Sequence, residues 1–486
     1  MKKYFLTIIA LATLWSCQTD ERYENLNRDP KNPTQVKAEF LFTAATNSLS
    51  DQMTSANVNT NVFRFFAQYL TTTTYLDEPN YVLNQRNIPQ NHSSELYRDV
   101  IFDLQNAKAV VEADTELTEA ERSARLGQIE VLEVYAWSVQ VDTFGDVPYT
   151  QAINAEEFPS PVYDDAATIY ADLISRLNAV GTNIQAGQGF TGADILYNGD
   201  MDKWNKFANS LQLRLGMRLS DVNPTLSKST AEAAIAGGVF ESNEDNAQLV
   251  YQSNPPRTNP LWVDLVQSGR ADYLPAATIV DIMNDLDDPR RATYFFNETV
   301  DDYIGGVYGG SNNYGSYSHV GEVFLDPTLP GILLDYVEVE FNLTKAADLG
   351  YTGAGVASAH YNAAITASIA YWGGNAADAT AYLAQPSVAY DGSNEQFATQ
   401  FWIAMFNNSF EGWSVWRKYD APGFVLPEDS GNFVPLRYTY PVNEQNLNFA
   451  NYQAASTAIG GDDQQTPVFW DTTTPDQSTY PGGPTE

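Results

Sequence analysis

One amphipathic stretch constrains the fold of this chain more than any other feature. Between about residues 119 and 143, apolar side chains recur every three residues, which places them on one face of an α-helix. They are Leu126, Ile129, Leu132 and Tyr135. Gly145 and Pro148 follow this run, and both residue types favour the end of a helix. The stretch therefore predicts a long helix with a buried face that stops at a sharp turn.

Helical periodicity returns along much of the chain. The predicted helices cover about residues 36–50, 56–71, 93–113, 119–143, 164–180, 201–220, 335–349, 355–372 and 393–411. We expect the first eight of these helices to form four pairs of antiparallel neighbours, taken two by two in chain order. The predicted fold class is mostly α, built from helical hairpins.

Two segments interrupt the helical rhythm. Residues 71–94 are polar, contain prolines and carry several aromatic rings. Residues 222–332 form a longer stretch that is also polar and contains prolines and aromatic rings. Its part at 301–319 is rich in glycine and tyrosine. A long polar loop with exposed aromatic rings is a candidate binding surface. A solvated connection that carries an occasional tyrosine is the alternative for residues 71–94.

Several motifs, taken in chain order, resemble the SusD/RagB family of surface glycan-binding lipoproteins, in its SusD-like branch. They are the sequence DTFGDVPY at 142–149, residues 203–211 followed by Arg214 and Arg218, RADY at 270–273, and residues 411–418, 435–441 and 468–471. Residues 342–345 depart from the family's usual alanine- and glutamate-rich sequence. The resemblance implies tetratricopeptide-like helical hairpins in a superhelix, joined to a mixed, loop-rich, non-repeat region.

The chain is strongly acidic, with 26 Lys and Arg against 61 Asp and Glu and a formal net charge of -35. Such a field repels nucleic acid and other anionic polymers at long range. We therefore expect no nucleic-acid partner and favour neutral partners, unless a local basic patch overrides the field. Arg214 and Arg218 lie one helical turn apart, so we expect them to pair with helix carboxylates.

The N-terminus has the layout of a secretory signal. Two lysines precede an apolar run that is too short to span a bilayer, and small Ser16 follows. The only cysteine, Cys17, ends a sequence that resembles a lipobox, which predicts lipidation at Cys17. Asp20 and Glu21 resemble an acidic export tag. We expect a signal peptide over residues 1–16 and a tether over 17–34.

The remaining residues, 35–486, are predicted to form a single SusD-like body. Helical pairs would occupy about 36–221 and 335–411, and a loop-rich, ligand-facing region would occupy about 222–334. The last part, about 412–486, is predicted to be non-repeat structure that clamps the helices.

The resemblance also implies a function. It describes an outer-membrane, cell-surface lipoprotein that captures neutral oligosaccharide and passes it to a SusC-like TonB-dependent transporter, over which it acts as a hinged lid. A pyranose stacks its C–H face on Tyr or Trp while polar side chains bind its hydroxyl groups. The candidate ligand contacts are Tyr75, Tyr81, Arg86, Trp262, Tyr273, Tyr308, Tyr314 and Tyr317.

Little in the sequence favours catalysis. The three histidines, His92, His319 and His360, are far apart and form no zinc motif, and no nucleophile elbow is present. We expect no catalytic residue, no cofactor and no metal site, although so acidic a chain leaves a structural calcium open. Two alternatives remain: a RagB-like protein that captures peptides, and a secreted glycoside hydrolase that uses a carboxylate pair.

Overall fold

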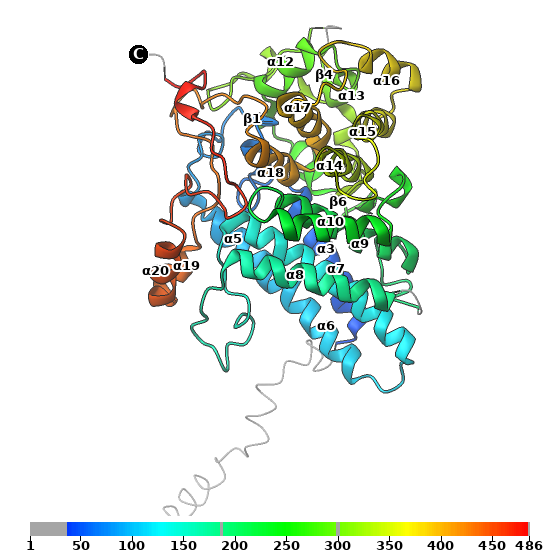
Figure 1. Ribbon diagram of the computed structural model, residues 1–486. Helices are drawn as coiled ribbons and strands as arrows, with labels where there is room; N and C mark the ends of the chain where they lie inside the picture. Colours follow the sequence, from blue (N-terminus) through cyan, green and yellow to red (C-terminus); the bar gives the residue numbers. More distant parts are fainter. Residues whose placement is uncertain (1–35, 185–187, 298–301, 485–486) are drawn as a thin grey trace, which may run out of the picture.

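Helix α7 spans Glu119–Phe144 near the middle of the molecule (Figure 1). This computed structural model describes residues 36–184, 188–297 and 302–484. Thr118 caps the helix, because its hydroxyl accepts from Glu121 N at 3.3 Å while the Glu121 carboxylate accepts from Thr118 N at 2.9 Å. At the other end Gly145 has a φ of +82°, which strains any residue with a Cβ. The predicted helix and its stop are confirmed.

Helices provide most of the ordered structure. The longer ones are α3 (Ala38–Thr54), α6 (Phe102–Ala113), α7, α8 (Ala166–Asn183), α9 (Met201–Arg218), α10 (Pro224–Gly237), α12 (Ala277–Asp285), α14 (Tyr336–Asp348), α15 (Ala357–Tyr371), α16 (Ala376–Leu383), α17 (Asn394–Ala404), α18 (Ser409–Tyr419) and α20 (Phe449–Ala458). Shorter helices are α4 (Phe63–Phe66), α5 (Ile88–Ser94), α11 (Pro260–Trp262), α13 (Arg291–Tyr294) and α19 (Val442–Leu447). π-Helical turns η2 (Glu95–Ile101) and η5 (Val263–Gln267) continue α5 and α11.

The strands are short and form three antiparallel pairs among the described residues. They are β1 (Leu70–Thr72) with β3 (Tyr273–Pro275), β2 (Ala247–Leu249) with β6 (Gly331–Leu334), and β4 (Phe295–Phe296) with β5 (His319–Val320). Each pair joins segments that are far apart in the chain or separated by a long loop. The predicted mostly α fold class is confirmed.

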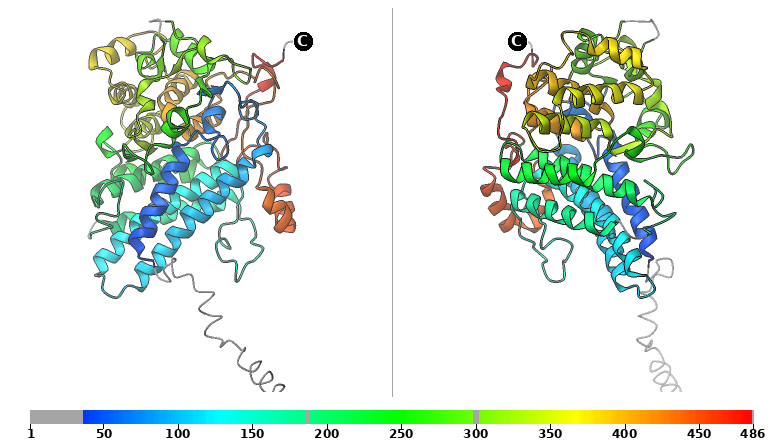
Figure 2. Two further views of the ribbon diagram at one scale, coloured as in Figure 1. Left: turned by 180° about the vertical axis from the view of Figure 1, so that it is seen from behind. Right: turned by 45° about the vertical axis from the view of Figure 1, so that its right-hand side comes forward.

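The helices stack in chain order, as Figure 1 shows from α6 at the bottom to α14 and α15 above. Helix α7 packs between α6 and α8, α9 packs on α8 and α10, and α14 packs on both α9 and α15. Three of the four predicted pairs are therefore confirmed: α6 with α7, α8 with α9, and α14 with α15. Two further views show the same layers from behind and from the side (Figure 2).

The first predicted pair is wrong. Residues 56–71 hold only the short helix α4 and strand β1, and α3 instead packs along η2 and α6. The spacing of Val62, Phe65, Phe66 and Tyr69 is therefore not the face of a long helix. These four side chains are fully buried because β1 starts directly after them and holds the chain in the core. The predicted helix 393–411 is also interrupted, since α17 and α18 are separate.

Helix α10 occurs where the sequence predicted a break in helical rhythm. Asn223 caps it by accepting a hydrogen bond from Leu226 N, and Pro224 occupies its first turn. The helix packs closely on α9, where a Cβ on Gly216 would lie 3.2 Å from Ala231 N. Its buried side chains are all small, and two of them are polar, which hides the apolar periodicity that identifies a packed helix; they are Ser227, Thr230, Ala231 and Ala234.

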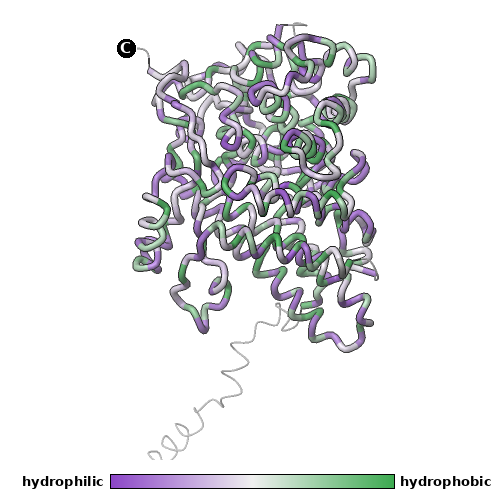
Figure 3. The backbone as a smooth tube through the Cα atoms, in the orientation of Figure 1, coloured by the Kyte–Doolittle hydropathy of each residue, from purple (hydrophilic) through white to green (hydrophobic). Residues whose placement is uncertain are grey.

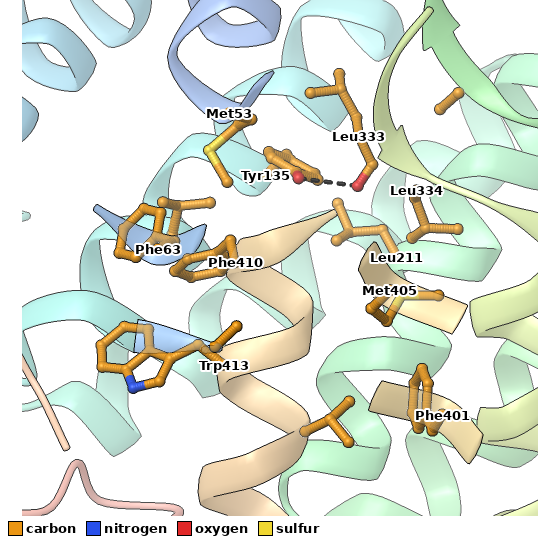
Figure 4. Packing of buried hydrophobic residues seen from close by; sticks show 14 of the residues in the cluster. Met53, Phe63, Tyr135, Leu211, Leu333, Leu334, Phe401, Met405, Phe410 and Trp413 are labelled. Atoms are coloured by element: carbon orange, nitrogen blue, oxygen red, sulfur yellow. Dashed lines mark hydrogen bonds between the residues drawn. The ribbon is translucent and has the colours of Figure 1, made fainter. Parts of the chain in front are cut away.

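One contiguous hydrophobic core runs from α3 to Trp470. Figure 4 shows part of it, where side chains from α3, α7, α9, β6, α17 and α18 meet. There Tyr135 donates a hydrogen bond of 2.9 Å to the carbonyl oxygen of Leu333, so the long helix α7 is joined to strand β6. Green and purple segments alternate along the outer helices in Figure 3, which is the pattern of helices with one buried face.

Buried ion pairs fix the helix layers to one another. Arg214 in α9 makes two hydrogen bonds to Glu338 in α14, of 2.5 and 2.6 Å. Arg218, one turn later, makes two to Glu411 in α18, of 3.1 and 2.7 Å. All four side chains are buried. The prediction that these arginines pair with helix carboxylates is confirmed, and removing one partner would leave a buried charge unpaired.

The C-terminal part closes over the end of α7. Arg417 donates to the carbonyl oxygen of Asp142 at 2.6 Å, and Arg437 donates to that of Phe144 at 2.9 Å. These carbonyls belong to the last turn of the helix, where no backbone donor within the helix remains for them. The DTFGDVPY motif is therefore bound by two arginines from the last quarter of the chain. The predicted signal peptide, tether and Cys17 lie outside the described residues.

Candidate ligand-binding site

Strands β1 and β3 bring two of the loop segments together. Thr72 pairs with Tyr273, and the pairing extends by one residue because Thr73 N donates to Asp272 O at 2.9 Å. The segment after β1 therefore runs beside the segment before β3. These segments are the polar loop that begins at residue 71 and the RADY motif at 270–273.

Tyr75 lies where these segments meet. The guanidinium carbons of Arg86 and Arg270 each lie 4.8 Å from the centre of its ring. This is the distance at which a cation is attracted to an aromatic face. Tyr75 is half-buried, and it holds two arginines from different parts of the chain on one aromatic ring.

Each of the two arginines is held by a carboxylate that is more deeply buried than its guanidinium group. Arg86 Nε donates to Glu78 Oε1 at 2.5 Å, and Arg270 Nε donates to Asp272 Oδ2 at 2.5 Å. The Glu78 side chain is 0% exposed, whereas that of Arg86 is 30% exposed and that of Arg270 is 50% exposed. The carboxylates are therefore inside and the guanidinium groups outside. Both arginines are held in position before any ligand arrives.

A small cleft of about 130 Å³ surrounds this cluster, and we refer to it as the Tyr75 cleft. Its lining residues are Asn57, Val58, Asn59, Tyr75, Arg86, Asp264, Ser268, Arg270, Asp272 and Tyr273. Amide, hydroxyl, carboxylate and guanidinium groups thus face one hollow beside an aromatic ring. Such a set can hydrogen-bond a hydroxyl-rich or charged ligand.

Burial changes the acid–base properties of the cleft. Desolvation, reinforced by the nearby Asp272 carboxylate, raises the pKa of Asp264 to about 6. Desolvation also raises the pKa of Glu78, although Arg86 opposes this. The hydrogen bond to Asp272 raises the pKa of Arg270, which remains a cation. Asp264 is therefore a group of the cleft that changes charge near neutral pH.

Three of the eight predicted contacts meet in this cleft: Tyr75, Arg86 and Tyr273. Trp262 is half-buried and lies two residues before Asp264 in the chain. Tyr314 and Tyr317 are half-buried in the glycine-rich segment and do not line the cleft. Tyr314 stacks on His319 with ring centres 4.0 Å apart. That these eight residues contact a ligand stays a prediction.

The expectation of exposed rings is wrong for Tyr81, Tyr273 and Tyr308. All three are at most 5% exposed. Tyr308 donates to Phe65 O at 2.6 Å, and Tyr81 accepts from Gln68 at 3.0 Å, so both hydroxyls are satisfied internally. Tyr81 borders another hollow, of about 590 Å³, and Tyr273 packs on Phe65 behind the cleft.

The glycines between residues 305 and 310 serve close packing and not exposure. A Cβ on Gly305 would lie 2.4 Å from Ala277 Cα, and one on Gly309 would lie 2.5 Å from Pro427 Cβ. Asn312 also donates to Thr72 O at 2.9 Å, which ties the segment to β1. Tyr308 is covered because the backbone around it lies directly against its neighbours, whereas Tyr303 and Tyr314 are half-buried.

The sequence did not identify several residues that line the cleft. Arg270 and Asp272 were recognised as a motif but not proposed as contacts, although their spacing of two places them on one face of an extended segment. Asn57 and Asn59 lie in an irregular segment and Asp264 lies in the short turn η5, and none of the three gave a signal because the position of both segments depends on tertiary structure. Only the pairing of β1 with β3 reveals that these segments meet.

A larger cavity of about 330 Å³ lies beside the turn that ends α7. Phe144, Val147 and Pro148 of the DTFGDVPY motif form part of its wall. Its polar groups are largely paired: Tyr97 donates to Pro148 O at 2.6 Å, and Tyr163 donates to Glu444 at 3.1 Å. The cavity therefore offers a ligand fewer free partners than the Tyr75 cleft does.

Over residues 36–184, 188–297 and 302–484, no three His, Cys, Asp or Glu side chains are grouped so that they could hold a metal ion. Within the same ranges, none of the helices has the length and apolar character needed to cross a membrane.

Comparison with known proteins identifies the family. The structure matches a chitin-binding protein with a TM-score of 0.76 and 25% identity, over 90% of this chain and 100% of that one. It matches a SusD homolog from Bacteroides uniformis at 0.75 and 25%, over 89% and 100%. A chitin-binding SusD homolog from Flavobacterium johnsoniae matches at 0.76 and 22%, over 90% and 99%. No curated protein matches the sequence.

The family model described as "Starch-binding associating with outer membrane" matches residues 30–441. This range includes α3 to α18 and every residue of the Tyr75 cleft. It covers well over half of the 486 residues, so the chain belongs to the SusD-like family.

Proposed function

We propose that this chain is a cell-surface lipoprotein of the outer membrane that captures oligosaccharide in the Tyr75 cleft and passes it to a SusC-like TonB-dependent transporter. The observation that carries the proposal is the cleft itself, in which Tyr75 is surrounded by amide, hydroxyl and guanidinium groups. The description of the family as starch-binding and the names of two chitin-binding relatives support a glycan ligand.

Capture without bond cleavage is the second part of the proposal. Asp264 and Asp272 are the two carboxylates that line the cleft, and a hydrolase would need one as an acid and one as a base or nucleophile. Asp272 accepts hydrogen bonds from Arg270 and from Thr74, of 2.5 and 2.9 Å. These bonds hold the carboxylate against the protein, which favours a structural carboxylate over an attacking one.

The membrane anchor and the transporter are parts of the same proposal. A lipid on Cys17 would hold the chain at the membrane surface, and residues 35–486 would form one body attached through the tether. The sequence at the N-terminus supports the anchor, and membership of the SusD-like family supports the transporter.

Isothermal titration tests capture directly. Protein that starts at Gln18, and so lacks the lipid, is titrated with oligosaccharides of chitin, starch, xylan and pectin. We expect a Kd of roughly micromolar to millimolar, because a few ring and hydrogen-bond contacts must offset an association cost of at least about 4 kcal/mol. Tyr75→Ala should weaken binding strongly, whereas Tyr336→Ala, a half-buried tyrosine on α14, should not.

Three other results would redirect the proposal. Steady release of reducing ends from polysaccharide by the pure protein would show a hydrolase. Tight binding of casein-type peptides with no binding of any glycan would show a peptide-capturing protein of the RagB kind. Unchanged glycan binding by Tyr75→Ala would place the site elsewhere on the molecule.

A further inference from the structure

We propose that the ligand of the Tyr75 cleft carries a carboxylate, so that the captured oligosaccharide is an acidic one built from uronic acids. This inference rests on the proposed function and adds the chemical class of the sugar. It departs from the neutral ligand that the net charge of the whole chain predicts. The two predictions differ because the net charge only counts charged residues, whereas the acidic ligand is inferred from where two arginines lie.

The two guanidinium groups present free donors to the cleft. Arg86 uses only its Nε–H, which donates to Glu78, and its four other N–H groups make no hydrogen bond to any described residue. Arg270 uses Nε and Nη2 for Asp272, at 2.5 and 3.4 Å, and its Nη1 has no partner within the described ranges. Two forks of N–H donors are thus available side by side.

Tyr75 explains why these donors suit an anion better than a neutral sugar ring. A sugar that stacks on an aromatic residue needs a bare ring face. Here two guanidinium carbons already lie 4.8 Å from the ring centre. The ring therefore orients the arginines, and an incoming ligand meets guanidinium N–H groups. Planar N–H forks match the two oxygens of a carboxylate, and such charge-assisted pairs are roughly twice as strong as neutral hydrogen bonds.

The carboxylates of the cleft do not cancel this preference, because of where they lie. Glu78 is fully buried and the Asp272 side chain is only 10% exposed, while the Arg270 side chain is 50% exposed. An anion in the cleft therefore approaches cations first. Asp264 opposes it as long as it is ionised. The two inner carboxylates mainly hold the guanidinium groups still, which lowers the entropy lost on binding.

The net charge of -35 acts mostly over longer distances. At physiological ionic strength the Debye length is about 8 Å, so charges spread over the surface are largely screened at the cleft. Contact pairs between a ligand carboxylate and Arg86 or Arg270 are screened much less. The overall charge slows the approach of an acidic ligand, and the two arginines decide whether it stays bound.

Matched ligands that differ only in charge test the inference. Oligogalacturonide of three to five residues and its fully methyl-esterified form have the same backbone, and only the first is anionic. Alginate oligomers and their carboxyl-reduced form provide a second pair. Titration with sulfated chondroitin oligosaccharides shows whether a sulfate ester can replace the carboxylate. Titration at pH 7 in about 0.15 M salt should show at least one acidic form binding about tenfold or more tightly than its neutralised partner.

Variants locate the effect. Arg86→Gln and Arg270→Gln each keep a donor for the buried carboxylate but remove the charge, and each should reduce the preference for the acidic form to about threefold or less. Arg98→Gln is the control, since Arg98 is also an exposed arginine bonded to a carboxylate, on η2. Circular dichroism and the urea midpoint confirm that each variant is folded.

Four results would overturn the inference. The first is equal binding of acidic and neutralised partners. The second is binding of neutral glycans alone, which would leave the proposed function intact. The third is an acidic preference that survives both arginine substitutions. The fourth is arginine-dependent binding of triglutamate with no binding of any acidic sugar, which would assign the carboxylate to a peptide and contradict the proposed function as well.

Discussion

Replacing Gly412 with alanine should destabilise the protein, although the same change stabilises most helices. Gly412 lies in α18, and a Cβ built on it would lie 2.1 Å from Tyr69 Oη and 2.7 Å from Tyr69 Cζ. Tyr69 is fully buried and donates to the carbonyl oxygen of Trp402 at 2.5 Å. Its own carbonyl accepts from Ala276 N at 3.1 Å, next to β3. The ring has no free space into which it can move.

Three effects set the magnitude. Glycine to alanine in a helix interior gains about 1 kcal/mol of helix propensity. Overpacking a filled core costs about 1–3 kcal/mol. Displacing the Tyr69 hydroxyl from Trp402 costs about 1 kcal/mol more, because a buried hydroxyl and a carbonyl lose their partners. The net expectation is a loss of about 1–3 kcal/mol in the free energy of unfolding.

Urea unfolding followed by tryptophan fluorescence measures this loss, since Trp402 and Trp413 are buried close to the site of the clash. Gly181→Ala is the matched control: Gly181 also lies within a helix, α8, and a Cβ there meets no atom within 4 Å. It should be neutral or stabilise by up to about 1 kcal/mol. Equal stabilisation by both substitutions would refute the claim that Tyr69 cannot yield.

Three further predictions concern the site and the anchor. Tyr308→Phe should lower the free energy of unfolding by about 1–2 kcal/mol, because Phe65 O loses its donor, and should leave glycan affinity unchanged; a large loss of affinity would show that the Tyr308 hydroxyl is a ligand contact. Cys17→Ala should move the protein from the membrane fraction to the soluble fraction of cells, and persistence in the membrane would exclude a lipid on Cys17 as the anchor. Binding of oligogalacturonide should tighten roughly fivefold from pH 7 to pH 5, because Asp264, with a pKa of about 6, loses its charge beside Asp272, Tyr273, Arg86 and Arg270. Asp264→Asn should bind tightly at both pH values, and a pH effect that survives this substitution would show another group to be responsible.

Local signals predicted most of the helices correctly. Helix α7 was predicted from an apolar stripe along its length and a glycine stop at its end, and both signals lie within the helix or next to it. The pair α14 and α15 was likewise predicted from its periodicity. Helix α10 was missed because its buried face is made of serine, threonine and alanine. These side chains fit against Gly216 but produce no periodic pattern of large apolar residues in the sequence. Periodicity detects large buried side chains and overlooks close backbone packing.

The cleft was only partly predictable, for a related reason. Tyr75 and Tyr308 are the same residue type in loops of similar composition, yet one is half-exposed and the other buried. What separates them is the partner that each meets: Tyr75 meets two arginines, whereas Tyr308 meets the backbone of Phe65. Arg86 is close to Tyr75 in the chain, but Arg270 and Phe65 lie about 200 residues or more from the tyrosines that they contact, and no local pattern encodes such a contact. The resemblance to the family indicated the loops but could not rank the rings within them.

Charge shows most clearly why position matters more than composition. The 26 basic residues of the chain include Arg214, Arg218, Arg290 and Arg437, which are buried and bonded to carboxylates. Each of these pairs is internally neutral, so it contributes little to the field outside the protein. Few cations are then left to offset the acidic surface. Arg86 and Arg270 differ from the buried arginines because their carboxylates lie beneath them and their free N–H groups face a hollow. A chain that repels anions as a whole can therefore hold one at this place, and a count of charges cannot reveal it.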